Sequence, residues 1–280
     1  MGNRRLVLNT VEVGQLRIAY RREGDGPCLV LLHGILQDSR SWRWQLEALF
    51  DQFTVIAWDA PGCGQSDDPP ADWRMPELAD CLEAFLRGLD IQKAHVLGLS
   101  LGTTIALELY RRHPVMVSSL ILASGYAGWA GSLSSVEVAQ RLELCLEQSE
   151  QDPANFVPLW IPGILTDSAP VALREEVAAI MADFHPAGFR MMAHAIAEAD
   201  MRDMLDDISV PTLLLYGEQD ERTPLDIARA MMLAIPVATL TTVPAVGHLL
   251  NCETPIIFND TVKEFLHSVP SHDSYRPRQP

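Results

Sequence analysis

One stretch of this chain, Lys93 to Arg112, constrains its fold more than any other. The apolar run His95 to Leu97 predicts a buried strand, and the residues from Thr104 onward place apolar side chains at helical spacing. Between them lies Gly98-Leu99-Ser100-Leu101-Gly102. A serine between two glycines, where a strand turns sharply into a helix, is typical of a nucleophile elbow, although it also fits an ordinary glycine-bounded turn. Whether Ser100 is a nucleophile therefore depends on the base, acid and oxyanion donors that the rest of the chain supplies.

Length and composition limit the class of protein. With 280 residues, 48% hydrophobic residues and 21% charged residues, the chain can bury a large core, and one core domain with an insertion fits best. The net charge of −16 argues against nucleic-acid or anionic-membrane partners, because their phosphates would be repelled. No apolar stretch is long enough to span a membrane, and no signal peptide is evident. We therefore expect a cytoplasmic protein that acts on a small molecule.

The cysteines give no sign of a disulfide framework or of a metal site. Their number is odd and they are widely scattered, at Cys28, Cys63, Cys81, Cys145 and Cys252. No C-x-x-C pair occurs, so a structural zinc site is not expected. Scattered cysteines are also typical of a reducing compartment.

Strands and helices alternate over residues 28–124, after a predicted hairpin at 5–22. The wholly apolar runs 28–32 and 54–58 are typical of strands that are covered on both faces, and 119–123 continues the series. Helices are expected after Ser39, through about Phe50, and from Pro76 to Leu86. This alternation predicts an α/β fold with a mainly parallel sheet, in which reactive groups gather at the carboxyl ends of the strands.

The alternation stops at Gly125, and residues 127–207 predict helices only. The expected helices are Val136–Gln148, Leu173–Ala182 and Gly188–Met201, with Trp129, Phe156 and Trp160 in the loops between them. Strands resume at 211–216 and 238–243, with helices at 224–234 and 255–267. We therefore expect a core domain formed by residues 1–126 and 208–270, a helical cap at 127–207 and a disordered tail at 271–280.

Two further residues complete a candidate catalytic triad. Asp220 follows the strand at 211–216, and His248 follows the strand at 238–243. The order serine, acid, histidine is the one expected of an α/β-hydrolase. His248 would accept the proton of Ser100, and Asp220 would hold the imidazole in the correct tautomer. Other carboxylates compete with Asp220 for this role: Glu218, Glu221 and Asp226.

Backbone N–H groups are the candidates for an oxyanion hole. Leu101, directly after the nucleophile, supplies one donor, and Ile35, after His33-Gly34, supplies the other. His33 also lies at a strand end, but it is expected to order this loop through hydrogen bonds and not to act as the base.

Together these motifs resemble the α/β-hydrolase superfamily over residues 5–268. The matching segments are His33-Gly34, Asp59-x-Pro61-Gly62-x-Gly64-x-Ser66, Gly98-x-Ser100-x-Gly102, Gly217-x-x-Asp220 and Gly247-His248. The resemblance implies a mostly parallel eight-stranded sheet flanked by helices, an inserted helical cap, and acyl transfer through an acyl-enzyme without a metal or organic cofactor.

A narrower resemblance, to the 3-oxoadipate enol-lactonase group and related carboxylesterases, rests on two segments. They are Pro186-Ala-Gly-Phe with Ala199-Asp200-Met-Arg202, and His248-Leu-x-Asn251-x-Glu253-x-Pro255. Thr103 departs from the pattern, because many relatives carry a further glycine there. A threonine at this position would restrict the space around the start of the helix.

The substrate pocket is expected beneath the cap. Trp129, Trp160, Phe189 and Met192 either line it or pack the cap onto the core. Arg174, Arg190 or Arg202 could bind a substrate carboxylate, although arginines on helices more often face solvent. The favoured function is hydrolysis of a small carboxylic ester or lactone. The alternatives are C–C bond hydrolysis of a vinylogous diketone, and a signalling protein that keeps the triad to bind a ligand. A monomer and a homodimer both remain open.

Overall fold

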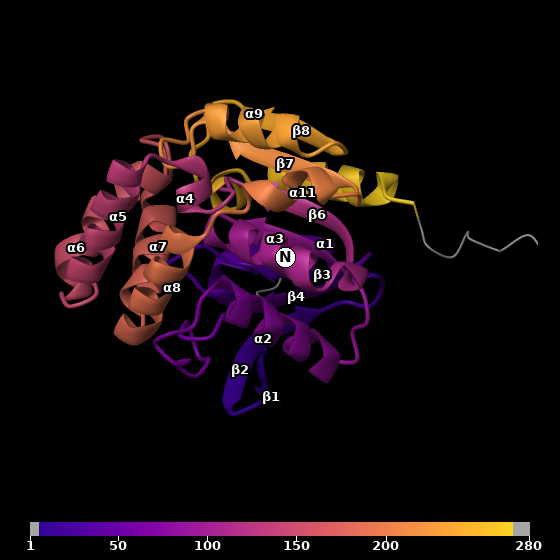
Figure 1. The fold of residues 1–280 in the computed structure, drawn as a ribbon, viewed down its shortest axis with the longest axis horizontal. Coiled ribbons are helices and arrows are strands. Elements are labelled where there is room, and N and C mark those ends of the chain that lie inside the picture. The colour runs from indigo at the N-terminus through magenta and orange to yellow at the C-terminus, as the bar shows by residue number, and fades with distance from the viewer. Residues whose placement is uncertain (1–5, 271–280) are drawn as a thin grey trace, which may run out of the picture.

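The computed structural model describes residues 6–270, and an eight-stranded sheet forms its centre (Figure 1). The strands follow the order β1-β2-β4-β3-β5-β6-β7-β8. Their bounds are β1 Leu8–Val13, β2 Leu16–Glu23, β3 Cys28–Leu32, β4 Thr54–Trp58, β5 Ala94–Leu99, β6 Val117–Ala123, β7 Thr212–Gly217 and β8 Ala238–Val243. Strand β2 is antiparallel to both β1 and β4, and every later pair is parallel. The predicted mostly parallel eight-stranded sheet is therefore confirmed, whereas the predicted disordered tail, 271–280, lies outside the described residues.

The burial of each strand follows its sequence pattern. Every residue of β4 is buried, as are the last four of β3, because helices cover both faces of the central sheet. Strand β1 instead alternates between exposed and half-buried residues, as an edge strand with one wet face does. Gly14, with φ +61°, closes the β1–β2 hairpin in a conformation that glycine adopts without strain.

Helices cover both faces of the sheet. Parallel crossovers are right-handed, so connections that run in opposite directions across the sheet lie on opposite faces. Helix α1 (Arg43–Leu49) connects β3 to β4, and α2 (Met75–Gly88) runs the other way, from β4 to β5. Helix α3 (Leu101–Arg112) packs beside α2, and α11 (Pro255–Ser268) packs beside α1. The shorter α10 (Leu250–Glu253) contacts α11, and α9 (Leu225–Ala234) contacts β7 and β8.

Between β6 and β7 the chain forms helices only, which stand together to one side of the sheet in Figure 1. They are α4 Trp129–Ser132, α5 Ser135–Gln148, α6 Pro153–Ile164, α7 Val171–Ala182 and α8 Pro186–Glu198, followed by the 3-10 helix Arg202–Asp207. Helix α8 contacts α4 and α5, and α6 contacts α7. The helices expected at 136–148, 173–182 and 188–201 correspond to α5, α7 and α8 within a few residues.

Two details of these helices differ from the sequence expectation. Phe156 and Trp160 lie on α6, not in a loop, although Pro158 and Pro162 fall inside that helix. An internal proline costs a helix about 3 kcal/mol. Helix α6 nevertheless buries one continuous apolar side, and that burial offsets the cost. Trp129 is likewise the first residue of α4.

A third difference concerns the helix expected after Ser39. The segment begins as a 3-10 helix, Ser39–Trp42, and the residue that caps it is Asp38, whose side chain accepts a hydrogen bond from the Arg40 N–H. All five cysteines are free thiols, and four of them are buried.

Candidate active site

The elbow between β5 and α3 holds Ser100 in a strained conformation. Its φ of 53° and ψ of −116° lie outside the regions that side-chain-bearing residues prefer. A Cβ at Gly98 would lie 2.3 Å from the Gly102 carbonyl oxygen, and one at Gly102 would lie 2.1 Å from that of Leu32. Both glycines are therefore required by close backbone contacts. The Ser100 N–H donates to the Ala123 carbonyl of β6 at 2.9 Å, which anchors the elbow to the sheet.

The Thr103 side chain links this elbow by hydrogen bonds to the segment that follows β6. Its hydroxyl donates to the Ser100 carbonyl oxygen at 2.6 Å and accepts from the Tyr126 N–H at 3.2 Å. A Cβ at Gly125 would come within 2.5 Å of the Thr103 methyl group, so the two residues are in close contact. As the sequence led us to expect, threonine fills the space around the helix start, and it also adds hydrogen bonds that glycine could not make.

Asp220 and His248 meet at the carboxyl ends of β7 and β8. The His248 Nδ1 atom lies 2.9 Å from Asp220 Oδ2 and 3.1 Å from Oδ1, and both side chains are buried. Asp220 Oδ1 also accepts from the backbone N–H groups of Arg222 and Thr223, at 2.8 and 2.9 Å, and the Thr223 hydroxyl donates to Oδ2. Burial acts to raise the pKa of Asp220, but the charge and hydrogen bond of His248, together with the Thr223 bonds, outweigh it and hold the pKa below its usual range.

The competing carboxylates lie apart from this pair. Glu218, Glu221 and Asp226 are exposed. Glu218 accepts a hydrogen bond from the Thr242 hydroxyl, and Asp226 pairs with Arg229 on α9. Within residues 6–270, Asp220 is the carboxylate that hydrogen-bonds to His248.

The loop after β3 lies directly against the elbow. A Cβ at Gly34 would be 3.4 Å from the Cβ of Ser100, and Ile35 lines the same pocket as Ser100. Leu101 is the first residue of α3, where an N–H has no acceptor within the helix. Ile35 and Leu101 therefore both lie beside Ser100, one in the adjoining loop and the other next in the chain, and their role in an oxyanion hole stays a prediction.

His33 joins the loops after β3 and β4. The Ala60 N–H donates to His33 Nε2 at 3.0 Å, so Nε2 carries no proton, and Nδ1–H donates to the Gly34 carbonyl at 2.8 Å. Burial lowers the pKa of His33, although the Gly34 carbonyl and the charges of Asp38 and Asp59 oppose this. His33 thus orders the loop that carries Ile35, as expected, and it has no free ring nitrogen with which to act as a base.

The pocket at Ser100 is formed by the core and by the helices between β6 and β7 together. Ile35 and Ser100 come from the core, whereas Trp129, Trp160 and Ile196 come from α4, α6 and α8. The remaining lining residues are Tyr126, Arg141, Leu144, Cys145 and Arg222. Two of the four side chains proposed to bind substrate, Trp129 and Trp160, therefore lie in the pocket with Ser100.

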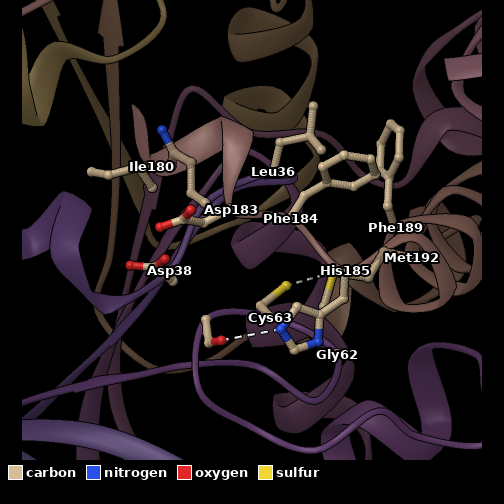
Figure 2. Close-up of a pocket in the computed structure, with 12 residues that line it drawn as sticks. Leu36, Asp38, Gly62, Cys63, Ile180, Asp183, Phe184, His185, Phe189 and Met192 are labelled. Atoms are coloured by element: carbon tan, nitrogen blue, oxygen red, sulfur yellow. Dashed lines mark hydrogen bonds between the residues drawn. The ribbon is translucent and has the colours of Figure 1, made fainter. Parts of the chain in front are cut away.

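The other two, Phe189 and Met192, line a neighbouring pocket. Figure 2 shows them with Leu36, Cys63 and His185, where the Cys63 thiol lies 3.7 Å from the Met192 sulfur. The Phe189 ring also packs against three others, with centroids 5.7 Å from Phe184 and 6.4 Å from both Phe156 and Trp160. Phe189 and Met192 thus do not line the Ser100 pocket, although Phe189 packs against Trp160, which does.

The three arginines proposed for a substrate carboxylate do not line the Ser100 pocket. Arg190 pairs with Glu150 and Arg202 with Asp200, whereas Arg174 donates to the carbonyls of Thr166 and Ala169. Sequence reasoning missed the two arginines that do line it, Arg141 and Arg222. The position of Arg222, two residues after Asp220, was the available signal. Arg141 gave none, because helical periodicity does not show which neighbour a helix will face.

This fold and site match a known family. The model of the alpha/beta hydrolase fold family matches residues 27–166, half of the chain. A protein of Azorhizobium caulinodans, named "Putative carbamate hydrolase RutD", is 30% identical over 256 residues, covering 90% of this chain and 96% of its own. The chain therefore belongs to the α/β-hydrolase fold family, which confirms the wider resemblance and the prediction of a hydrolase.

Two further comparisons concern the narrower resemblance. A 3-oxoadipate enol-lactonase of Acinetobacter baylyi is 28% identical over 251 residues, covering 89% of this chain and 91% of its own. The structure of a thermophilic esterase from Thermogutta terrifontis superposes with a TM-score of 0.87 at 26% identity, covering 95% of this chain and all of the esterase. Both an enol-lactonase and an esterase are thus among the proteins that this chain resembles, as the narrower resemblance predicted. Within the part of the chain that the structure covers, no helix has the length and apolar character to cross a membrane.

Proposed function

We propose that this protein hydrolyses a small carboxylic ester or lactone through an acyl-enzyme. The observation that carries the proposal is the buried Asp220–His248 hydrogen bond at the same sheet edge as the strained Ser100 elbow. Because Asp220 accepts a hydrogen bond from the Nδ1–H group of His248, the proton stays on Nδ1 and Nε2 is left as the free base. The relatives named as an enol-lactonase and an esterase support this class of substrate.

Each residue then has a defined part in the reaction. His248 Nε2 removes the Ser100 proton as the serine oxygen bonds to the substrate carbonyl carbon, and the carbonyl oxygen becomes an oxyanion held by the Ile35 and Leu101 N–H groups. The C–O bond of the ester breaks when His248 returns the proton to the leaving alcohol. Water, activated by the same histidine, then releases the acid and restores Ser100.

In this proposal the helices of residues 127–207 form a cap, and residues 1–126 and 208–270 form the core domain. The mixed origin of the pocket supports this division, since Trp129, Trp160 and Ile196 close over Ser100 from the helical segment. The cap therefore determines which acyl and alcohol groups fit, while the core supplies the chemistry.

The test is labelling by a fluorophosphonate together with hydrolysis of an ester panel. Ser100→Ala is expected to abolish labelling and to lower kcat by roughly 10⁵-fold or more, with an unchanged circular dichroism spectrum. Ser124→Ala is the matched control, because Ser124 is also a buried serine at the end of a neighbouring strand. Labelling of Ser100→Ala at the wild-type rate would refute the assignment. The panel includes lactones, carbamates and a vinylogous diketone, so that it also distinguishes ester hydrolysis from its alternatives.

A further inference from the structure

Two arginines line the Ser100 pocket without a carboxylate partner. Arg141 comes from α5, and Arg222 comes from the loop after β7. Within residues 6–270, neither forms an ion pair, whereas Arg190, Arg202 and Arg229 on the surface each pair with an acid. The chain carries 37 acidic and 21 basic side chains other than histidine, so carboxylates are in excess. Two unpaired guanidinium groups in the reactive pocket of an acidic protein therefore need a physical reason.

The contacts of Arg141 hold it in place and leave most of its donors unused. Its Nη1 donates to the Tyr126 hydroxyl at 2.7 Å, and its Nη2 lies 3.4 Å from the Arg222 carbonyl oxygen. Its guanidinium also lies 5.8 Å from the ring centroids of Tyr126 and Trp129, within cation–π range. A guanidinium has five N–H donors, so several remain for a ligand.

Arg222 has even more unused N–H donors than Arg141. Its Cζ atom lies over the Trp160 ring, 4.2 Å from the ring centroid, within cation–π range. A Cβ at Gly163 would lie 3.1 Å from its Nε atom, so α6 holds this side chain closely. Among the described residues no group accepts a hydrogen bond from its side chain, whereas its backbone bonds to Asp220, Tyr126 and Arg141.

Among residues 6–270, no carboxylate pairs directly with either guanidinium group. Asp220 lies two residues from Arg222 in the chain, but its oxygens are bonded to His248, Thr223 and the Arg222 N–H. Burial raises the pKa of Tyr126, and it raises that of Cys145 to about 12, so both side chains are neutral near pH 7. Burial and the charge of Arg141 disfavour the positive charge of Arg222, and guanidinium groups do not lose their proton in proteins.

We propose that Arg141 and Arg222 form a carboxylate-binding subsite, and that the substrate is an ester or lactone that carries a free carboxylate besides the bond that is cleaved. This inference rests on the hydrolase function proposed above and names its substrate class. A planar carboxylate matches the N–H edge of a guanidinium, and its charge offsets the repulsion between the two cations. The Trp129 and Trp160 rings would enclose the apolar part of the substrate, between its carboxylate and the bond that is cleaved.

The test compares two substrates that differ only in this charge: p-nitrophenyl hydrogen adipate and its neutral analogue, p-nitrophenyl methyl adipate. The wild-type enzyme is expected to favour the acid in kcat/KM by at least about 10-fold after subtraction of the uncatalysed rate. Arg222→Gln and Arg141→Gln should each lower kcat/KM for the acid by roughly 10- to 100-fold and for the neutral ester by less than about 3-fold. Arg229→Gln, an exposed arginine on α9, is the matched control and should change neither.

A lysine in place of either arginine should restore part of the preference, because the charge returns without the planar fork. Equal kcat/KM values of the wild-type enzyme for the two esters would overturn the subsite. So would an unchanged preference in both glutamine variants.

Binding of glutarate, followed by tryptophan fluorescence, separates this inference from the hydrolase function. If the protein binds glutarate and Arg222→Gln abolishes that binding, the subsite stands even if no ester is cleaved, and the proposed chemistry alone fails. If esters are cleaved but glutarate does not bind and the acid is not preferred, the subsite alone fails.

Discussion

Gly62 and Gly188 meet backbone to backbone: a Cβ on Gly188 would lie 2.0 Å from the carbonyl oxygen of Gly62. The first glycine belongs to the loop after β4, and the second lies in the first turn of α8. This contact seats α8 on the core. Gly188→Ala should therefore lower the free energy of unfolding by about 1–3 kcal/mol, because an atom in a filled interface displaces the backbone.

Urea unfolding measures this effect, and Gly88→Ala is the matched control. Gly88 also lies in a helix, but its Cβ would meet only the Val11 side chain at 3.3 Å. Alanine is the better helix former, so this control should be neutral or slightly stabilising. An equal loss in both variants would mean that the Gly62–Gly188 contact has no special part in stability.

Asp220→Asn should lower kcat by about 10⁴-fold, because an amide no longer fixes the tautomer of His248 or stabilises its positive charge. Glu218→Gln and Glu221→Gln remove exposed carboxylates from the same loop and should leave kcat within about 2-fold. Steady-state kinetics on one neutral ester decides between them. A large loss in Glu221→Gln with little effect in Asp220→Asn would show that Glu221, and not Asp220, is the acid of the triad.

Thr103→Val should lower the free energy of unfolding by about 1–3 kcal/mol, because the Tyr126 N–H then loses its buried acceptor. Thr103→Ser keeps the hydroxyl and should recover most of this loss, apart from the methyl group. Urea unfolding of the two variants beside the wild type separates the hydrogen bond from the packing. If serine were as damaging as valine, packing against Gly125 would be the cause.

His33 should make the protein less stable in mild acid. Burial lowers the pKa of His33 in the folded state, whereas an unfolded histidine has a pKa of about 6.5. The unfolded state therefore binds a proton first as the pH falls, so the contribution of His33 is fully present above about pH 6.5 and is lost below it, by up to about 1.4 kcal/mol per pH unit.

His33→Gln tests this linkage, because glutamine does not titrate. Urea unfolding near pH 7.5 and near pH 5.5 should show a steeper loss for the wild type than for the variant. The comparison is needed because burial and the charge of Asp38 raise the pKa of Asp59. Protonation of Asp59 therefore favours the folded state as the pH falls, opposite to the effect of His33 on stability. Identical pH dependence in the two proteins would mean that His33 titrates alike in the folded and unfolded states.

The sequence was most informative where structure is local. Ser100, Asp220 and His248 each follow a predicted strand, so strand ends alone predicted that they would share one edge of the sheet. Helix α6 was missed because Pro158 and Pro162 argue against a helix, and only the apolar partners of Trp160 and Ile161 outweigh that cost. Phe189 and Met192 were predicted to bind substrate, but they line a different pocket from Ser100. Which face of a helix meets which cavity depends on tertiary packing, and no repeat in the chain encodes it.

The loop after β7 has a consequence for anyone who wishes to redesign this enzyme. The backbone N–H of Arg222 anchors Asp220, and the side chain of the same residue lines the pocket. Insertions, deletions or a proline in this loop would alter both the proposed triad acid, Asp220, and the Ser100 pocket. Helix α5 carries Arg141 on a separate element that does not touch the acid. Directed evolution of substrate preference should therefore begin with a library on α5 and admit only side-chain exchanges at position 222.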